Sequence, residues 1–367
     1  MTSSEIYLEF LRAGLWNRPA VVSGSINLNE VLNLADSQST LPLVSKSVLD
    51  RCGQKLSPVL AEKLKARVEK CARAHHAANT VIAYVCEELD RAGIESVLLK
   101  GQGIASWYSV PTLRQPGDID LYVRDYGRAC EIISRLFPEN SVETEKHTAF
   151  HIGGSLELEL HKFTEVLPSR RMNSVYQKIS DEGTGVDLAP VVLEGASIKT
   201  PSDTFNALYI FHHLWHHTLG MGIGMRQLCD WTAFLMSHKG KLDTVKLEKW
   251  LRDLHLMDIW QVFGCAAVQA LELDPEAVPF YDAGKMARGS RLVGFFLKQG
   301  DNRALKHGRH GESAVKHKTG SLRYMFKKLG MMFPVFPVVA LQQFVRDFKN
   351  GLGKLFKARP SDAGSEE

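Results

Sequence analysis

The feature that most constrains the fold is the segment Val97–Val123, which reads VLLKGQGIASWYSVPTLRQPGDIDLYV. An apolar run leads into a turn containing Gly101 and Gly103, an amphipathic segment follows, and a proline- and glycine-containing turn precedes a second run. In that second run acids and hydrophobes alternate, so Asp118 and Asp120 share one face of a strand and the hydrophobes share the other. The segment therefore predicts a strand, a glycine-containing turn, a helix and a second strand.

The two aspartates predict a cation site. Carboxylates one strand step apart repel each other, so a fold that holds Asp118 and Asp120 together is expected to neutralise them. Carboxylate oxygens suit a hard divalent cation, and Mg²⁺ is usually bound by a few carboxylates together with substrate phosphates. We therefore expect Mg²⁺ here. Because like charges cost stability when the metal is absent, an Asn substitution at either position should change the stability of the fold little.

The same residues resemble the nucleotidyltransferases of the DNA polymerase β superfamily. The signature of that superfamily is a strand, a glycine-containing turn, a helix and then Asp-x-Asp on the next strand. The sequence motif LLKG…LRQPGDIDLYV most resembles a poorly characterised bacterial branch of the superfamily, in which Leu-Lys-Gly replaces the usual Gly-Gly or Gly-Ser. The turn has no serine hydroxyl, so the resemblance implies that Lys100, Gly101 and Gly103 contact the phosphates of the nucleotide.

The resemblance also implies a third acid on a neighbouring strand. In this branch an acid, a hydrophobe and a histidine stand at that strand, and the matching residues here are Glu159, Leu160 and His161. Glu159 would bind metal or act as the base, and His161 would orient the acid or contact the acceptor. Glu157 is the alternative third acid, and a solvated strand face is the alternative explanation for the alternating segment LELELHKF.

Two arginines are candidates for contact with the triphosphate. Arg114 stands just before the aspartates, and a guanidinium is well suited to bidentate contact with phosphate. A structural pairing of Arg114 with Asp118 or with a backbone carbonyl remains open. The segment GIGMRQLCDW resembles a helical part of the same branch and supplies Arg226. The alternative for Arg226 is a salt bridge with Asp230, four residues later on a helix.

Four histidines stand in the segment FHHLWHHT. His212 and His216 are four residues apart, as are His213 and His217, so each pair shares a helix face. Each helical residue advances about 100°, so the two pairs point in different directions. We expect one pair to line the cleft, and we take His213 and His217 as candidates for orienting or acceptor contacts. Zinc is a minor alternative, because the glutamate of a His-Glu-x-x-His motif is missing.

Composition restricts the class of protein. The chain of 367 residues is 44% hydrophobic and 23% charged, which is typical of an ordinary soluble protein, and its net charge of +4 does not call for nucleic acid. Its six cysteines form no Cys-x-x-Cys pair, which favours a reducing compartment. The N-terminus has no secretory pattern, and no apolar run reaches the ~18 residues of a membrane span. We therefore expect a cytoplasmic protein without a transmembrane segment.

The predicted fold class is α/β (α+β), with a small mixed sheet between N-terminal helices and a C-terminal helical domain. A long helix is predicted over Leu60–Ala92, ending at Gly93, and a hairpin is predicted through Gly153-Gly154. A helix cap at Pro201-Ser202-Asp203 begins the last part. The expected divisions are an N-terminal helical region at 1–92, a nucleotidyltransferase domain at 93–200, a helical domain at 201–360 and a disordered tail at 361–367.

The function implied by the resemblance is Mg²⁺-dependent transfer of a nucleoside monophosphate from an NTP to an unknown acceptor, with release of pyrophosphate. ATP is the NTP we expect, and the acceptor is a small molecule or a macromolecule. Two alternatives stay open, a catalytically silent nucleotide-binding or partner-binding module and a toxin-like enzyme that modifies RNA or protein. The basic segment Arg303–Lys357 would give weak contact with an anionic membrane or RNA, or would pack as a last helix with a basic outer face.

Overall fold

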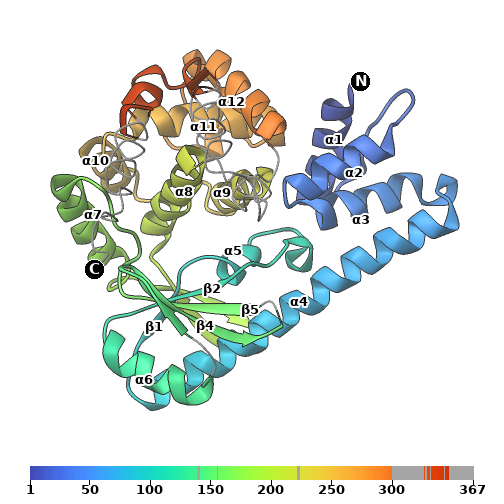
Figure 1. The fold of residues 1–367 in the computed structure, drawn as a ribbon. Coiled ribbons are helices and arrows are strands. Elements are labelled where there is room, and N and C mark those ends of the chain that lie inside the picture. Colours follow the sequence, from blue (N-terminus) through green and yellow to red (C-terminus); the bar gives the residue numbers. More distant parts are fainter. Residues whose placement is uncertain are drawn as a thin grey trace, which may run out of the picture.

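The computed structural model of the chain describes residues 1–138, 141–154, 156–220 and 224–299, together with short pieces between 326 and 346. The basic segment Arg303–Lys357 lies largely outside these residues, and the tail 361–367 lies wholly outside them. Three layers are visible in Figure 1, with a small sheet between a pair of helices on one face and a larger helical body on the other.

The helices and strands alternate only in the middle of the chain. The helices are α1 (Ser3–Trp16), α2 (Leu28–Ser37), α3 (Leu41–Cys52), α4 (Pro58–Arg91), α5 (Gln102–Ala105), α6 (Tyr126–Leu136), α7 (Arg170–Gly183), α8 (Asp203–Gly220), α9 (Met225–Ser237), α10 (Thr244–Asp253), α11 (Met257–Leu271) and α12 (Met286–Gln299). The strands are β1 (Ser96–Leu98), β2 (Ile119–Val123), β3 (Ser141–Glu143), β4 (His147–Gly153), β5 (Leu156–His161), β6 (Ala189–Leu193) and β7 (Ala196–Thr200). This mixed α/β architecture with a C-terminal helical region confirms the predicted fold class.

The main sheet has the strand order β1-β2-β5-β4-β3. The pair β2 and β5 is parallel, whereas the other neighbours in this sheet are antiparallel, so the sheet is mixed as predicted. The predicted hairpin is confirmed as β4 and β5. Strands β6 and β7 form a separate two-stranded sheet.

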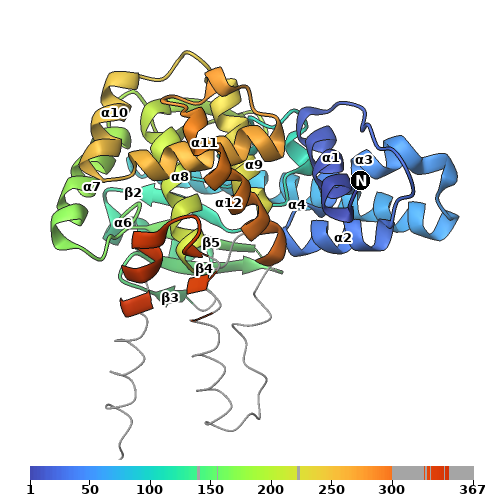
Figure 2. The ribbon, with the colours of Figure 1, turned by 90° about the horizontal axis from the view of Figure 1, so that it is seen from above.

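The two faces of the main sheet differ in chemistry. The hydrophobic residues of β2 and β5, among them Leu121 and Leu160, are fully buried against residues of α4 and α6 such as Ile82 and Ile133. The acids and histidines of the same strands point to the other face, because strand side chains alternate. Figures 1 and 2 show α8 over this polar face, opposite α4 and α6. The polar face is therefore enclosed between the sheet and the helical body.

Helix α4 joins the N-terminal helices to the back of the sheet. It is 34 residues long, about 50 Å at the usual rise, and its bounds agree with the predicted helix to within two residues at its start and one at its end. Its start follows from two local signals, since the side chain of Ser57 accepts a hydrogen bond from the backbone N–H of Leu60 and Pro58 occupies the first turn. One end packs against α3 and the other against α6 and β7.

The N-terminal helix packs against a helix near the other end of the described chain. The Arg12 guanidinium donates to the carbonyl of Ala270 at 2.8 Å, and the Trp16 indole donates to the carbonyl of Leu271 at 2.6 Å, both carbonyls belonging to the end of α11. Buried residues of α1, α3, α8, α9, α11 and α12 belong to one continuous hydrophobic core. The helices before and after the sheet are thus packed as one body.

Three local features differ from the sequence prediction. The helix after the glycine turn, expected to extend to about Tyr108, is only the four-residue α5. No helix was predicted from the sequence over Arg170–Gly183, where α7 lies and buries Tyr176 and Ile179. The apolar run at 191–193 pairs with β7 through a turn at Glu194 and Gly195, both with positive φ, a conformation typical of tight hairpins.

The length and apolarity of the described helices bear on whether any of them could span a membrane. Within the described residues, no single helix combines the length and apolarity needed to cross a bilayer. The bent pair α10 and α11 reaches that length and composition only when its two helices are counted together.

Candidate active site

Parallel pairing of β2 and β5 brings the predicted acids together. In this register Asp120 lies directly beside Glu159, so both side chains point to the polar face of the sheet. Asp118 precedes β2 by one residue and lies two positions before Asp120, and its carboxyl experiences the charges of both Asp120 and Glu159. The structure thus places the three acids on one face, as expected, while their catalytic roles stay predictions.

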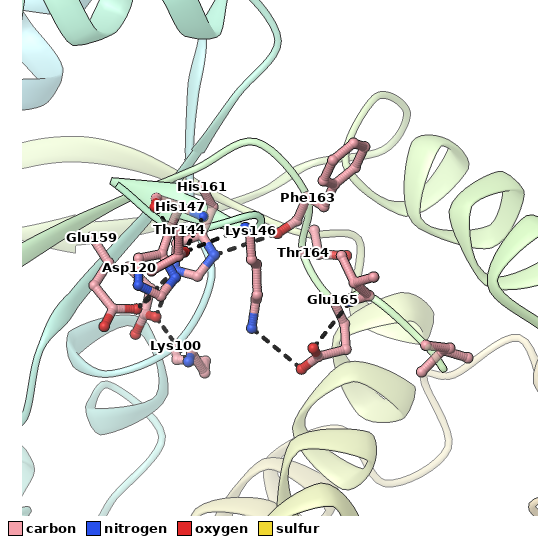
Figure 3. A network of polar contacts seen from close by, with 12 residues as sticks. Lys100, Asp120, Thr144, Lys146, His147, Glu159, His161, Phe163, Thr164 and Glu165 are labelled. Carbon is pink, nitrogen blue, oxygen red and sulfur yellow. Dashed lines mark hydrogen bonds and ion pairs between the residues drawn. The ribbon is translucent and has the colours of Figure 1, made fainter. Parts of the chain in front are cut away.

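Asp120 is the buried centre of this group. One of its oxygens, Oδ1, lies 2.8 Å from Nζ of Lys100 and 2.9 Å from Nε2 of His161 (Figure 3). Burial alone would raise the pKa of Asp120, but the Lys100 ammonium and the His161 ring outweigh it and hold the pKa far below its ordinary value. These two neighbours therefore favour the ionised form of Asp120.

Glu159 lies between two imidazoles. Its Oε2 is 3.2 Å from Nε2 of His161 and 3.5 Å from Nδ1 of His147. His147 comes from β4, where it pairs in register with His161 on β5, so both rings lie on the polar face. The sequence prediction did not include His147. A register shift between His151 and Gly153 sets this pairing, so counting back from the predicted turn at Gly153-Gly154 would not have placed His147 beside His161.

Asp118 differs from Asp120 in being exposed. Partial desolvation raises the pKa of Asp118, and the negative charges of Asp120, Glu159 and Glu157 raise it further. This accumulation of like charge is what a divalent cation relieves. The carboxylate donors fit Mg²⁺, so Asp118, Asp120 and Glu159 are the residues that would hold it.

The turn between β1 and β2 supplies Lys100, Gly101 and Gly103. Gly101 has φ +59°, which favours glycine, and a Cβ there would approach the carbonyl oxygen of Asp118 to 3.3 Å. Gly103 instead packs closely on the side chain of Thr200. This packing explains why a glycine stands there, and no contact with a ligand is needed to explain it. Of these three residues, Lys100 is the one whose side chain forms an ion pair with an acid of the group, Asp120.

Arg114 is held by Asp230 of α9. Its Nε donates to Oδ1 at 2.7 Å and its Nη2 donates to Oδ2 at 2.9 Å, and both side chains are buried. The Tyr108 hydroxyl donates to the same Oδ1 at 2.6 Å. Of the alternatives left open by the sequence, a structural pairing is thus what this geometry favours, with Asp230 as the partner in place of Asp118.

Arg226 lies at the loop that leads into the aspartates. Its Nη1 donates to the carbonyl of Gln115 at 3.2 Å and lies 3.8 Å from the position of a Cβ built on Gly117. Gly117 immediately precedes Asp118, so Arg226 is positioned at the edge of the acid group.

The four histidines of α8 divide as the helical geometry requires. His212 is buried beside the Tyr176 ring, with centroids 5.3 Å apart, and burial lowers its pKa to about 4. The rings of His213 and His217 meet edge to face, with centroids 4.3 Å apart. Burial and the Lys100 ammonium lower the pKa of His213 well below its usual value, so this ring lies near Lys100, whose ammonium pairs with Asp120. The side of α8 that carries His213 is therefore the side nearer to Lys100.

A second acid–base pair extends the polar face. Lys146 Nζ lies 3.2 Å from Oε2 of Glu165, and Figure 3 shows this pair beside the Asp120 group. Glu165 is buried and lies within electrostatic range of His212 and His216 on α8. The sequence prediction included neither residue, because no local pattern marks a pair formed between a strand end and the loop that follows the next strand.

Comparisons with known proteins give a family and a similar solved structure. A family model described as "Uncharacterised nucleotidyltransferase" matches residues 24–269. Among solved structures, the chain is similar to an antigenic nucleotidyltransferase-like protein from Paracoccidioides brasiliensis, with 15% sequence identity, a TM-score of 0.32, and coverage of 54% of this chain and 93% of that chain. No curated protein matches the chain.

Proposed function

Because the chain belongs to the family described as uncharacterised nucleotidyltransferases, we propose that it transfers a nucleoside monophosphate from an NTP to an acceptor hydroxyl or phosphate, with Mg²⁺ as the cofactor. The observation that carries this proposal is the parallel register of β2 and β5, which sets Asp120 beside Glu159 on the polar face, with Asp118 at the start of the same strand. ATP is the first NTP to test.

The residues divide into three roles under this proposal. Asp118, Asp120 and Glu159 hold the metal, which when bound neutralises the triphosphate and lowers the pKa of the attacking hydroxyl. The acceptor oxygen forms a bond to the α-phosphorus, the bond to the β-phosphate oxygen breaks, and pyrophosphate leaves. In the alternative role, Glu159, which is flanked by His147 and His161, would take the acceptor proton in place of binding the metal.

Cationic side chains on both walls support a triphosphate site. Lys100 comes from the turn after β1, and Lys146 precedes β4. Lys146 forms an ion pair with Glu165, and the charge of Glu165 also acts on Lys100. Both lysines therefore lie near Glu165. Arg226 approaches from α9. An anionic ligand entering between the sheet and α8 would exchange these internal pairings for contacts with phosphate oxygens.

NTP with Mg²⁺ should raise the melting temperature of the protein. A ligand that binds only the native state at about 100 times its Kd adds roughly 2.7 kcal/mol to the free energy of unfolding, which corresponds to a shift of a few degrees. Differential scanning fluorimetry with each of the four NTPs, with Mg²⁺ or with EDTA, measures it. A melting temperature that no NTP changes would favour the silent-module alternative.

The acceptor is found by a transfer assay. Each NTP, labelled on its α-phosphate, is incubated with the protein and with separate pools of RNA, protein and small metabolites. Label that appears only in the RNA or protein pool would favour the toxin-like alternative, whereas label in the metabolite pool would identify a small-molecule acceptor. An Asp118→Asn control in parallel separates transfer by this site from contamination.

Substituting His213 and His217 together by Gln should weaken the apparent affinity for the NTP about thirtyfold. Each ring would lose a hydrogen bond to the ligand, and a net hydrogen bond contributes about 1 kcal/mol. His216→Gln is the matched control, because this residue is exposed on the same helix. If KM and kcat are the same in the double variant and the control, the pair is structural and α8 does not contribute to the nucleotide site.

A further inference from the structure

Three potential metal ligands meet at the edge of the polar face. His147, Glu159 and His161 each direct one ligand atom to a common point, and these atoms all lie within 4.8 Å of one another. In the part of the chain that the structure describes, this is the one such group of three or more. The α8 histidines, for which zinc was a minor alternative, do not form one among those residues.

The spacing of these atoms matches a small coordination sphere. A tetrahedral zinc site with bonds of 2.0–2.1 Å has ligand atoms about 3.3 Å apart. Glu159 Oε2 lies 3.2 Å from His161 Nε2 and 3.5 Å from His147 Nδ1. An ion could therefore enter with little movement of these side chains.

The orientation of the His161 ring also suits a metal ligand. Nδ1 of His161 lies 3.4 Å from the carbonyl oxygen of Phe163, and Nε2 faces one carboxylate oxygen each of Asp120 and Glu159. Ligating histidines commonly donate their other N–H to a backbone carbonyl in this way.

His147 provides an independent observation. Its Nδ1 is buried and makes no hydrogen bond within the described residues, although it is directed toward Glu159. Buried polar atoms of this kind are rare and call for an explanation, such as an ion bound beside them.

We propose that His147, Glu159 and His161 bind a divalent transition-metal ion of the zinc class. Two imidazole nitrogens with one carboxylate suit zinc, whereas Mg²⁺ prefers oxygen ligands. The site shares Glu159 with the Mg²⁺ site of the proposed function but differs from it in ligand chemistry. It requires only these side chains, so it stands whether or not the protein transfers nucleotides.

The test is a zinc titration without nucleotide. Metal-free, tag-free protein is titrated with Zn²⁺ by calorimetry in excess Mg²⁺, and a single zinc ion should bind. His147→Gln should weaken zinc binding at least about tenfold. His151→Gln is the matched control, since His151 lies on the same strand and face but pairs in register with Glu157. The control should keep the wild-type affinity within about twofold.

A second measurement uses the wild-type protein alone. Co²⁺ in place of zinc should give the intense visible absorption of a four-coordinate site with nitrogen ligands, so the test does not depend on whether the His147 variant folds. The proposal is overturned if His147→Gln binds zinc as tightly as the wild type does, if excess Mg²⁺ abolishes zinc binding, or if Co²⁺ gives only the weak absorption of an octahedral ion. Because no NTP is present, each result is independent of the transfer assay.

Discussion

Asp118→Asn is expected to reduce the rate of nucleotidyl transfer about a thousandfold and to leave the melting temperature unchanged or slightly higher. Charge stabilisation by a bound metal contributes several kcal/mol, and about 4 kcal/mol corresponds to a thousandfold in rate. The unchanged melting temperature follows from the position of the Asp118 side chain. Asp118 is exposed and its pKa is raised by Asp120, Glu159 and Glu157, so removing its charge relieves repulsion.

The measurement pairs a Mg²⁺ titration of the transfer rate with thermal unfolding. Glu157→Gln is the matched control, because Glu157 is an exposed acid that faces the same group but is not assigned to the metal. It should retain nearly full activity. Asp120 is a poorer position for this test than the sequence suggested, since its loss would leave the buried Lys100 ammonium unpaired. An Asp118→Asn variant with more than about a tenth of the wild-type rate would remove the metal assignment.

Asp230→Asn is expected to lower the free energy of unfolding by about 3 kcal/mol, because breaking a buried ion pair leaves an uncompensated charge. The side chains of Arg114 and Asp230 are only 6% and 7% exposed, and they are joined by two hydrogen bonds. Burial opposes the charge of Arg114, but Asp230 more than offsets this and raises the pKa of the guanidinium above its ordinary value. The variant would retain that charge with a weaker partner.

Urea denaturation of the wild type and the variant measures the difference. The control is Asp253→Asn, which breaks an exposed pair with Lys249 and should cost at most about 0.5 kcal/mol. The same experiment decides the role of Arg114. If Asp230→Asn folds with wild-type stability and changes only KM for the NTP, then Arg114 contacts the triphosphate as the sequence resemblance implied.

The sequence predicted on which face of the sheet each residue lies better than it predicted which strands pair with each other. Alternation with a period of two placed Asp118 with Asp120, and Glu159 with His161, because that rule needs only the strand itself. The parallel register that sets Asp120 beside Glu159 joins residues 39 positions apart and came only through the family resemblance.

Pairings between distant helices and loops could not be predicted. Arg114 and Asp230 are separated by 116 positions, and nothing local distinguishes a guanidinium that binds phosphate from one that binds a carboxylate on another helix. The short α5 escaped prediction for a related reason. Its segment has helical spacing, but the chain must turn back at once for β2 to pair with β1, and tertiary structure overrides local propensity.

The packing of α1 against α11 has a consequence for how the chain can be divided. The sheet with its acids is in effect an insertion, which the chain enters along α4 and leaves at the start of α8, inside a helical assembly built from both flanks. A fragment lacking residues 1–92 would lose α4 from behind the sheet and would also uncover the end of α11. Any graft of this sheet onto another helical frame must therefore match both connections at once, the one through α4 and the one into α8.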